Sequence, residues 1–74
     1  MEMIVSRFGS HAFIQFDKVI KDYTIIILNN KGKILHRYLI NNKDFLMVDD
    51  INSDKNYIIK ILDHHNEIIA RKKI

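Results

Sequence analysis

Two adjacent histidines, His64 and His65, are the residues of this chain that come closest to a metal site. A zinc site needs three or four ligands that converge on one point. Neighbouring residues of a strand point to opposite faces, and no histidine stands two or four residues from either. In a turn the pair would need help from His11 or His36, whose distance the sequence does not give. The sequence therefore predicts that these histidines lie in an exposed turn, and that the chain binds no metal and no cofactor.

Groups that could act as an acid, a base or a nucleophile are present, but they form no catalytic pattern. Asp49 and Asp50 are an adjacent carboxylate pair, and adjacent residues at a strand end diverge, whereas an acid–base pair must face one substrate. The serines sit in no nucleophile motif, and the chain has neither a glycine-rich phosphate loop nor a cysteine. We therefore expect that the chain is not an enzyme.

The basic residues are grouped, although the net charge is only +3. The segment from Lys31 to Lys43 carries basic side chains and no acid, whereas Asp44 to Asp54 carries acids and no base. Lysine on an edge strand can simply block edge-to-edge pairing. The same side chains could instead contact an anionic protein or nucleic acid, with Tyr38 available to stack on a base. Both interpretations stay open on sequence alone.

The elements that must position these residues read as strands throughout. Short runs rich in isoleucine, other β-branched residues and aromatics alternate with polar turn clusters about every ten residues, which is typical of a sandwich or barrel. We predict one all-β domain over residues 1–74, an immunoglobulin-like antiparallel β-sandwich of about seven strands, with a five- to six-stranded barrel as the alternative. The predicted strands are 2–8, 11–17, 23–29, 33–40, 45–49, 57–63 and 68–74, and the segment from Lys18 to Asp22 is predicted to be a loop.

Turn residues and face patterns refine this prediction. Gly32 and Asn66 stand where hairpins need a positive φ, and Asn52 or Asn56 is expected to adopt one in the loop between the fifth and sixth strands. The run 23–29 is apolar on both faces and is therefore predicted to be a central strand. In the run 57–63, the face with Tyr57 is placed in the core, because Lys60 marks the wetter face. For the run 33–40, the sequence does not decide which face is buried.

This chain has more apolar strand surface than one core can use. A two-sheet sandwich covers only one face of each sheet, so apolar residues on the other faces must be exposed or covered by a partner. If the last strand lay near the basic hairpin, the two basic groups would form one patch. The candidate partner-binding residues are therefore Lys31, Lys33, Arg37, Tyr38, Arg71, Lys72, Lys73, Ile26, Leu28, Ile58 and Leu62.

The last fifty or so residues follow a layout that is known from one family. An Asn-rich turn with "GK" at Asn29–Lys33 is followed by Ile51, by "YIIKI" at Tyr57–Ile61 and by a second turn at Asp63–Glu67. A basic final strand follows at Arg71–Ile74, and His11–Phe16 fits a first-sheet strand. This layout resembles the small immunoglobulin-like β-sandwich modules of Bacteroidetes, including the C-terminal sorting domains of type IX secretion. The resemblance implies a sandwich and a sorting or cell-surface role.

Three functions follow as expectations. The first is a non-catalytic, stand-alone module that binds a larger protein or ribonucleoprotein, as a small inhibitor or adaptor of the phage or mobile-element type; a homodimer is compatible with it. The second is the sorting or cell-surface module, and the third is weak nucleic-acid binding through the basic hairpin. No apolar run reaches the ~18 residues that span a bilayer, and the N-terminus is not a signal peptide. We expect a cytoplasmic protein if the chain is complete, and an exported one if it is a trimmed sorting module.

Overall fold

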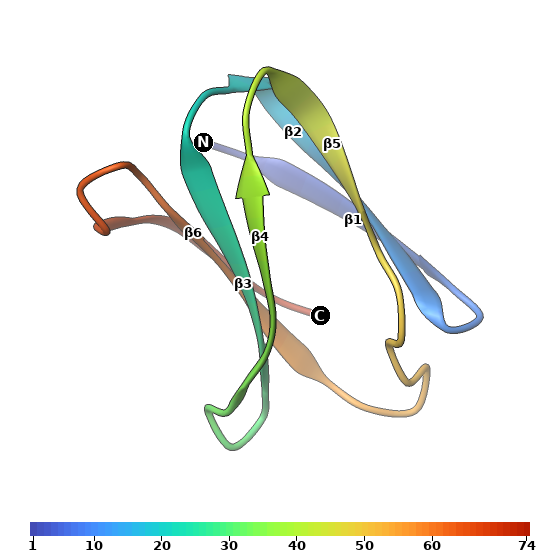
Figure 1. Ribbon diagram of the computed structural model, residues 1–74. Coiled ribbons are helices and arrows are strands. Elements are labelled where there is room, and N and C mark those ends of the chain that lie inside the picture. Colours follow the sequence, from blue (N-terminus) through green and yellow to red (C-terminus); the bar gives the residue numbers. More distant parts are fainter.

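Seven strands and no helix make up the computed structural model of the chain, which describes residues 1–74 (Figure 1). The strands are β1 (Met3–Phe8), β2 (His11–Ile20), β3 (Tyr23–Asn29), β4 (Ile34–Ile40), β5 (Lys43–Val48), β6 (Tyr57–Leu62) and β7 (Ile68–Lys73). Each predicted strand is therefore confirmed to within a few residues. No helix that could cross a membrane is present.

The strands form two antiparallel sheets that face each other (Figure 1). One sheet has the order β1-β2-β5 and the other has the order β4-β3-β6-β7. In a constant-type immunoglobulin domain the fourth strand pairs with the fifth. Here β4 pairs with β3 instead, so it widens the second sheet. The predicted small antiparallel β-sandwich is confirmed, and β3 is a central strand as predicted.

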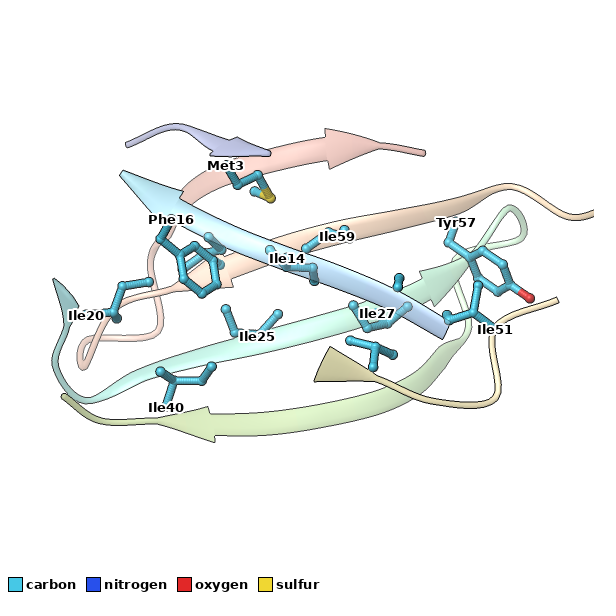
Figure 2. Packing of buried hydrophobic residues seen from close by; sticks show 13 residues of the cluster. Met3, Ile14, Phe16, Ile20, Ile25, Ile27, Ile40, Ile51, Tyr57 and Ile59 are labelled. Atoms are coloured by element: carbon cyan, nitrogen blue, oxygen red, sulfur yellow. The ribbon is translucent and has the colours of Figure 1, made fainter. Parts of the chain in front are cut away.

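The core lies between the sheets and is wholly apolar (Figure 2). Ile25 and Ile27 from β3 and Ile59 from β6 meet Ile14 from β2, and all four are at most 1% exposed. The prediction that Tyr57 lies on the buried face of its strand is confirmed, since it is 4% exposed. The sequence does not decide which face of β4 is buried. In the structure Ile40 points inward and Arg37 outward.

The segment from Lys18 to Ile20 is strand and not loop, which corrects the sequence prediction. Ile20 is buried and faces Lys43 across an irregular stretch of the β2–β5 ladder. The backbone N–H of Asn42 also donates to the carbonyl of Ile20 (2.7 Å). The sequence does not reveal this extension, because its side chains show no apolar alternation. Ile20 is the only buried residue in it.

Two hairpins use the same turn chemistry. Oδ1 of Asn29 accepts hydrogen bonds from the N–H groups two and four residues later (2.9 Å each). Oδ1 of Asp63 does the same in the β6–β7 hairpin (2.9 and 3.0 Å). The positive φ predicted at Gly32 and Asn66 is confirmed, at 83° and 63°. The corresponding prediction for the loop after β5 is wrong.

In that loop Asp50 takes the positive φ, at 59°, and neither Asn52 nor Asn56 does. The side-chain Oδ1 of Asn52 instead accepts the N–H of Asp54 (2.9 Å), and its carbonyl accepts the N–H of Lys55 (3.1 Å). Asn52 therefore opens a turn in an ordinary backbone conformation, which is a common role for asparagine.

Candidate interface on the sheet faces

The outer face of the four-stranded sheet gathers most of the candidate partner-binding residues. We call it the basic face, and define it as the outward residues of β4, β3, β6 and β7. These are Ile34, Arg37, Leu39, Thr24, Ile26, Leu28, Ile58, Lys60, Leu62, Ile68, Arg71 and Lys73.

A row of cationic side chains crosses the middle of the basic face. The register places Arg37 opposite Ile26, Ile26 opposite Lys60, and Lys60 opposite Arg71. Adjacent strands are about 4.8 Å apart, so these charges span roughly 14 Å across the sheet. No acidic residue occurs in any of the four strands. The row is therefore a band of positive charge that no carboxylate on the face neutralises.

Aliphatic rows flank this cationic row on both sides. Leu28 and Ile58 lie opposite each other in one row, and Thr24 and Leu62 in the other. The outer positions of these rows are exposed, most of all Leu39 at 80%. Ile26, at the centre, is only 8% exposed. It is covered by side chains of its own sheet, because long basic side chains lay their aliphatic stems over apolar neighbours.

This arrangement changes the expectation for the outward apolar residues. Ile26 and Leu28 need no partner to be covered. The exposed apolar surface is instead at the ends of the rows, at Ile34, Leu39 and Ile68.

The structure separates the two basic segments that the sequence suggested would meet. β4 and β7 are the opposite edges of the sheet, so the hairpin with Lys31 and Lys33 is not adjacent to β7. The expectation of one patch made by these two segments is wrong. The patch that does form runs through Lys60, whose place in the row follows from the register of β3 with β6. Lys60 was not among the predicted site residues.

Two of the predicted contact residues face the other way. Tyr38 lies opposite Ile25 and packs against the core, where burial raises the pKa of its phenol and the nearby carboxylates of Asp49 and Asp50 raise it further. Nζ of Lys72 donates to the carbonyl of Met3 (3.1 Å). Tyr38 and Lys72 are therefore not on the basic face, because alternation along their strands places them on the inner side.

The outer face of the three-stranded sheet is a second exposed surface, which the sequence reading did not single out. We call it the aromatic face, and define it as the outward residues of β1, β2 and β5 with the two that flank them. These are Glu2, Ile4, Ser6, Phe8, His11, Phe13, Gln15, Asp17, Lys43, Phe45, Met47 and Asp49. The signal was present in "HAFIQF", where both the odd and the even positions carry large side chains.

Aromatic rings dominate this face. Phe13 and Phe45 come from adjacent strands and stack with centroids 5.8 Å apart, and Phe8 lies 5.9 Å from the ring of His11. Ile4, Phe8, Phe45 and Met47 are each between 42% and 66% exposed. Such a cluster of exposed apolar side chains is typical of an interaction surface.

The titratable side chains of the chain make two close contacts. Nδ1 of His11 lies 2.7 Å from Oδ1 of Asp49, and both side chains are exposed. The rings of His64 and His65 lie 4.0 Å apart in the turn after β6. No three His, Cys, Asp or Glu side chains are close enough together to hold a metal ion.

Comparison with known proteins gives no further guide. No family model matches the chain, and no curated protein is recognisably related to it. The resemblance to the Bacteroidetes modules therefore stays a prediction, and function has to be argued from the two sheet faces.

Proposed function

We propose that the chain is a non-catalytic binding module that docks its basic face onto an apolar, acidic surface of a larger protein. The observation that carries this proposal is the row of Arg37, Lys60 and Arg71 between two aliphatic rows. Aliphatic side chains supply area to bury, and the cationic row selects a partner with carboxylates at matching positions. Binding of this kind would block or bridge the partner, which is how a small inhibitor or adaptor acts.

The size of the face fits an interface of modest strength. The two longest dimensions of the molecule are 31 and 22 Å. A whole sheet face is then close to the ~800 Å² per partner of a standard protein interface. Arginine is enriched among the residues that dominate binding energy. Arg37 and Arg71 border the apolar rows, so a partner would remove both guanidinium groups from water only if it pairs them.

Nucleic acid is a less favoured partner for this face. Single-stranded nucleic acid is held by aromatic side chains on which bases stack, together with a basic groove. The basic face carries no aromatic residue, and Tyr38, the candidate for that role, points to the core. A ribonucleoprotein partner would accordingly be contacted on its protein component.

A second candidate function is a sorting or cell-surface module of the type IX kind. The observation that favours it is the grouping of β1, β2 and β5 in one sheet and of β3, β6 and β7 in the other, which an immunoglobulin-like sandwich shares. Gene context tests this candidate: an in-frame exported passenger upstream would support it, and an independent start of translation at Met1 would contradict it.

The main proposal is tested by two charge-reversal variants that carry the same change in net charge. Arg37→Glu/Lys60→Glu alters the basic face, and Lys31→Glu/Lys33→Glu alters the β3–β4 hairpin outside it. Each tagged protein is incubated with nuclease-treated lysate of its source cells, and the bound proteins are identified by mass spectrometry. We expect proteins that the wild type and the hairpin variant retain to be lost at least tenfold with the face variant.

The opposite pattern would contradict the proposal. Retention by the face variant together with loss in the hairpin variant would move the site to the hairpin. Material bound from untreated lysate but not from nuclease-treated lysate, with an affinity that falls steeply as salt rises, would favour the nucleic-acid alternative. Circular dichroism spectra that match the wild type exclude misfolding as the cause of either loss.

A further inference from the structure

The aromatic face differs from the basic face in charge as well as in side-chain type. Its carboxylates lie at both ends. The backbone N–H of Asp17 donates to the carbonyl of Glu2 (3.2 Å), which pairs these two residues at one end. Asp49 lies beside His11 at the other end. Lys43, whose Nζ is 5.9 Å from the centroid of the Phe45 ring, is a basic side chain at its margin.

The two outer faces of one molecule are thus complementary to each other. One has a cationic row in the middle with aliphatic side chains on both sides. The other has an apolar, aromatic middle with carboxylates at its ends. A cationic row placed against aromatic rings makes favourable cation–π contacts. On a single chain the two faces point away from each other, because the core lies between them.

We propose that the aromatic face of one copy docks on the basic face of a second copy, so that the chain associates head to tail. Charge decides against symmetric pairing. Two basic faces in contact would oppose Arg37, Lys60 and Arg71 with their own copies, and two aromatic faces would bring carboxylates together. Like charges placed across an interface are unfavourable by several kcal/mol. Head-to-tail contact avoids both costs.

Sheet-on-sheet packing gives such a contact a known geometry. Two sheets packed face to face lie about 10 Å apart with their strands within about 30° of each other. Repeating this contact would continue the sandwich as a stack of alternating three- and four-stranded sheets. A head-to-tail contact that does not close into a ring has no fixed number of copies. Association therefore increases with concentration, without a plateau at the dimer.

Self-association would also control the basic face. A copy seated on that face covers the row that the proposed function assigns to another protein. Only the end copy of a stack would present a free basic face. The two proposals share this surface, but head-to-tail association needs no other partner and can be tested alone.

Sedimentation equilibrium on the purified chain measures the association directly. The monomer is 8.8 kDa. We expect the weight-average mass of the wild type to rise beyond twice that value as concentration increases from micromolar to millimolar. Arg37→Glu/Lys60→Glu removes the basic face, and Phe45→Gln/Met47→Gln removes the aromatic face. Each variant alone should remain monomeric, while the hairpin variant Lys31→Glu/Lys33→Glu should behave as the wild type.

Mixing the two face variants provides the decisive test. Each keeps the face that the other has lost, so an equimolar mixture should form a dimer and nothing larger. A symmetric interface cannot give this result, because it uses the same face on both copies. The variant that keeps that face would dimerise alone, and the other variant could not join it. Where Phe45→Gln/Met47→Gln fails to unfold cooperatively, Ile4→Gln replaces it, since Ile4 is 66% exposed and outside the core.

Three results would overturn the inference: a wild type that is monomeric at millimolar concentration, a face variant that still associates, or a mixture that stays monomeric. None of them bears on binding of another protein. If the wild type is monomeric but Arg37→Glu/Lys60→Glu still loses its bound proteins, the proposed function stands and only the self-association fails.

Discussion

The two faces of β3 carry nearly the same residues, but different parts of the molecule shield them from solvent. Ile25 and Ile27 point inward and are at most 1% exposed, while Ile26 and Leu28 point outward and are 8% exposed. The inner pair is covered by the opposite sheet, as Figure 2 shows for the strand that carries Ile14. The outer pair is covered only by side chains of its own sheet. Low exposure alone therefore does not distinguish a core residue from a residue of a binding surface. The distinction is whether the opposite sheet or the residue's own sheet covers it.

Replacing an inner residue should have the largest effect. Ile27→Ala leaves a cavity between the sheets, where rigid neighbours cannot close it. The expected loss is about 2–5 kcal/mol of the free energy of unfolding. A domain of this length holds only roughly 4–11 kcal/mol in total. Urea denaturation should show a much lower midpoint, or no folded baseline at all.

Replacing Ile26, one residue earlier, by alanine should lower the free energy of unfolding by less. For Ile26→Ala we expect a loss of about 1–2 kcal/mol, because flexible stems such as that of Lys60 can move into the space. Partner binding through the basic face should weaken by more than this stability change accounts for. Equal denaturation midpoints for Ile26→Ala and Ile27→Ala would contradict the distinction between the two sides.

Tyr57→Phe tests a polar atom at the rim of the core, the Tyr57 hydroxyl. The Tyr57 hydroxyl accepts the backbone N–H of Asn52 (2.8 Å). Phenylalanine keeps the ring, which lies 5.5 Å from Cζ of Arg7, and removes only this acceptor. We expect a loss of about 1 kcal/mol in urea denaturation. No loss would mean that water replaces the hydroxyl as the acceptor, and the inner layer would then be wetter at this end.

The smallest effect should come from charge, since no charged side chain is buried in the core. Backbone N–H groups of Glu67 and His65 hold the pKa of the Asp63 carboxyl below its ordinary value of 3.8. A carboxyl with a lowered folded-state pKa stabilises the fold above its unfolded-state pKa. That stabilisation is lost as the pH falls through the folded-state pKa. The Tm of the wild type should accordingly fall below about pH 4.

Asp63→Asn isolates this contribution. The amide keeps an oxygen acceptor but does not titrate, so its Tm should change less between pH 6 and pH 2 than that of the wild type. Asp44→Asn is the matched control, because Asp44 is an exposed aspartate of β5 that accepts no side-chain hydrogen bond. The Tm of this variant should vary between pH 6 and pH 2 as that of the wild type does. If the Tm of Asp63→Asn changed more with pH than that of the wild type, the stabilising role assigned to the Asp63 carboxylate would be contradicted.

Local patterns were sufficient to predict the strands, the two hairpin turns and the inner face of β6. Alternation depends only on neighbouring residues, and so do the positive φ values of Gly32 and Asn66. The extension of β2 to Ile20 could not be predicted in this way, because it depends on a pairing with Lys43.

The candidate site depends on register to a greater degree. Arg37, Lys60 and Arg71 are far apart in sequence, and only the order β4-β3-β6-β7 and its pairings place them in one row. The inward position of Tyr38 is likewise set by its partner Ile25. The aromatic face was open to prediction from "HAFIQF", but alternation alone cannot tell which of two large-residue faces is the core.

The strand order also has a kinetic consequence. Three pairings join neighbours in the chain, β1 with β2, β3 with β4 and β6 with β7, and these can form early as hairpins. The other two bring distant segments together: Phe13 meets Met47, and Ile27 meets Ile59. Sandwiches that depend on such distant pairings fold in milliseconds to seconds, much more slowly than an isolated hairpin forms. During that interval each hairpin still exposes an unpaired edge, so the newly made chain passes through its most aggregation-prone state before either sheet is complete.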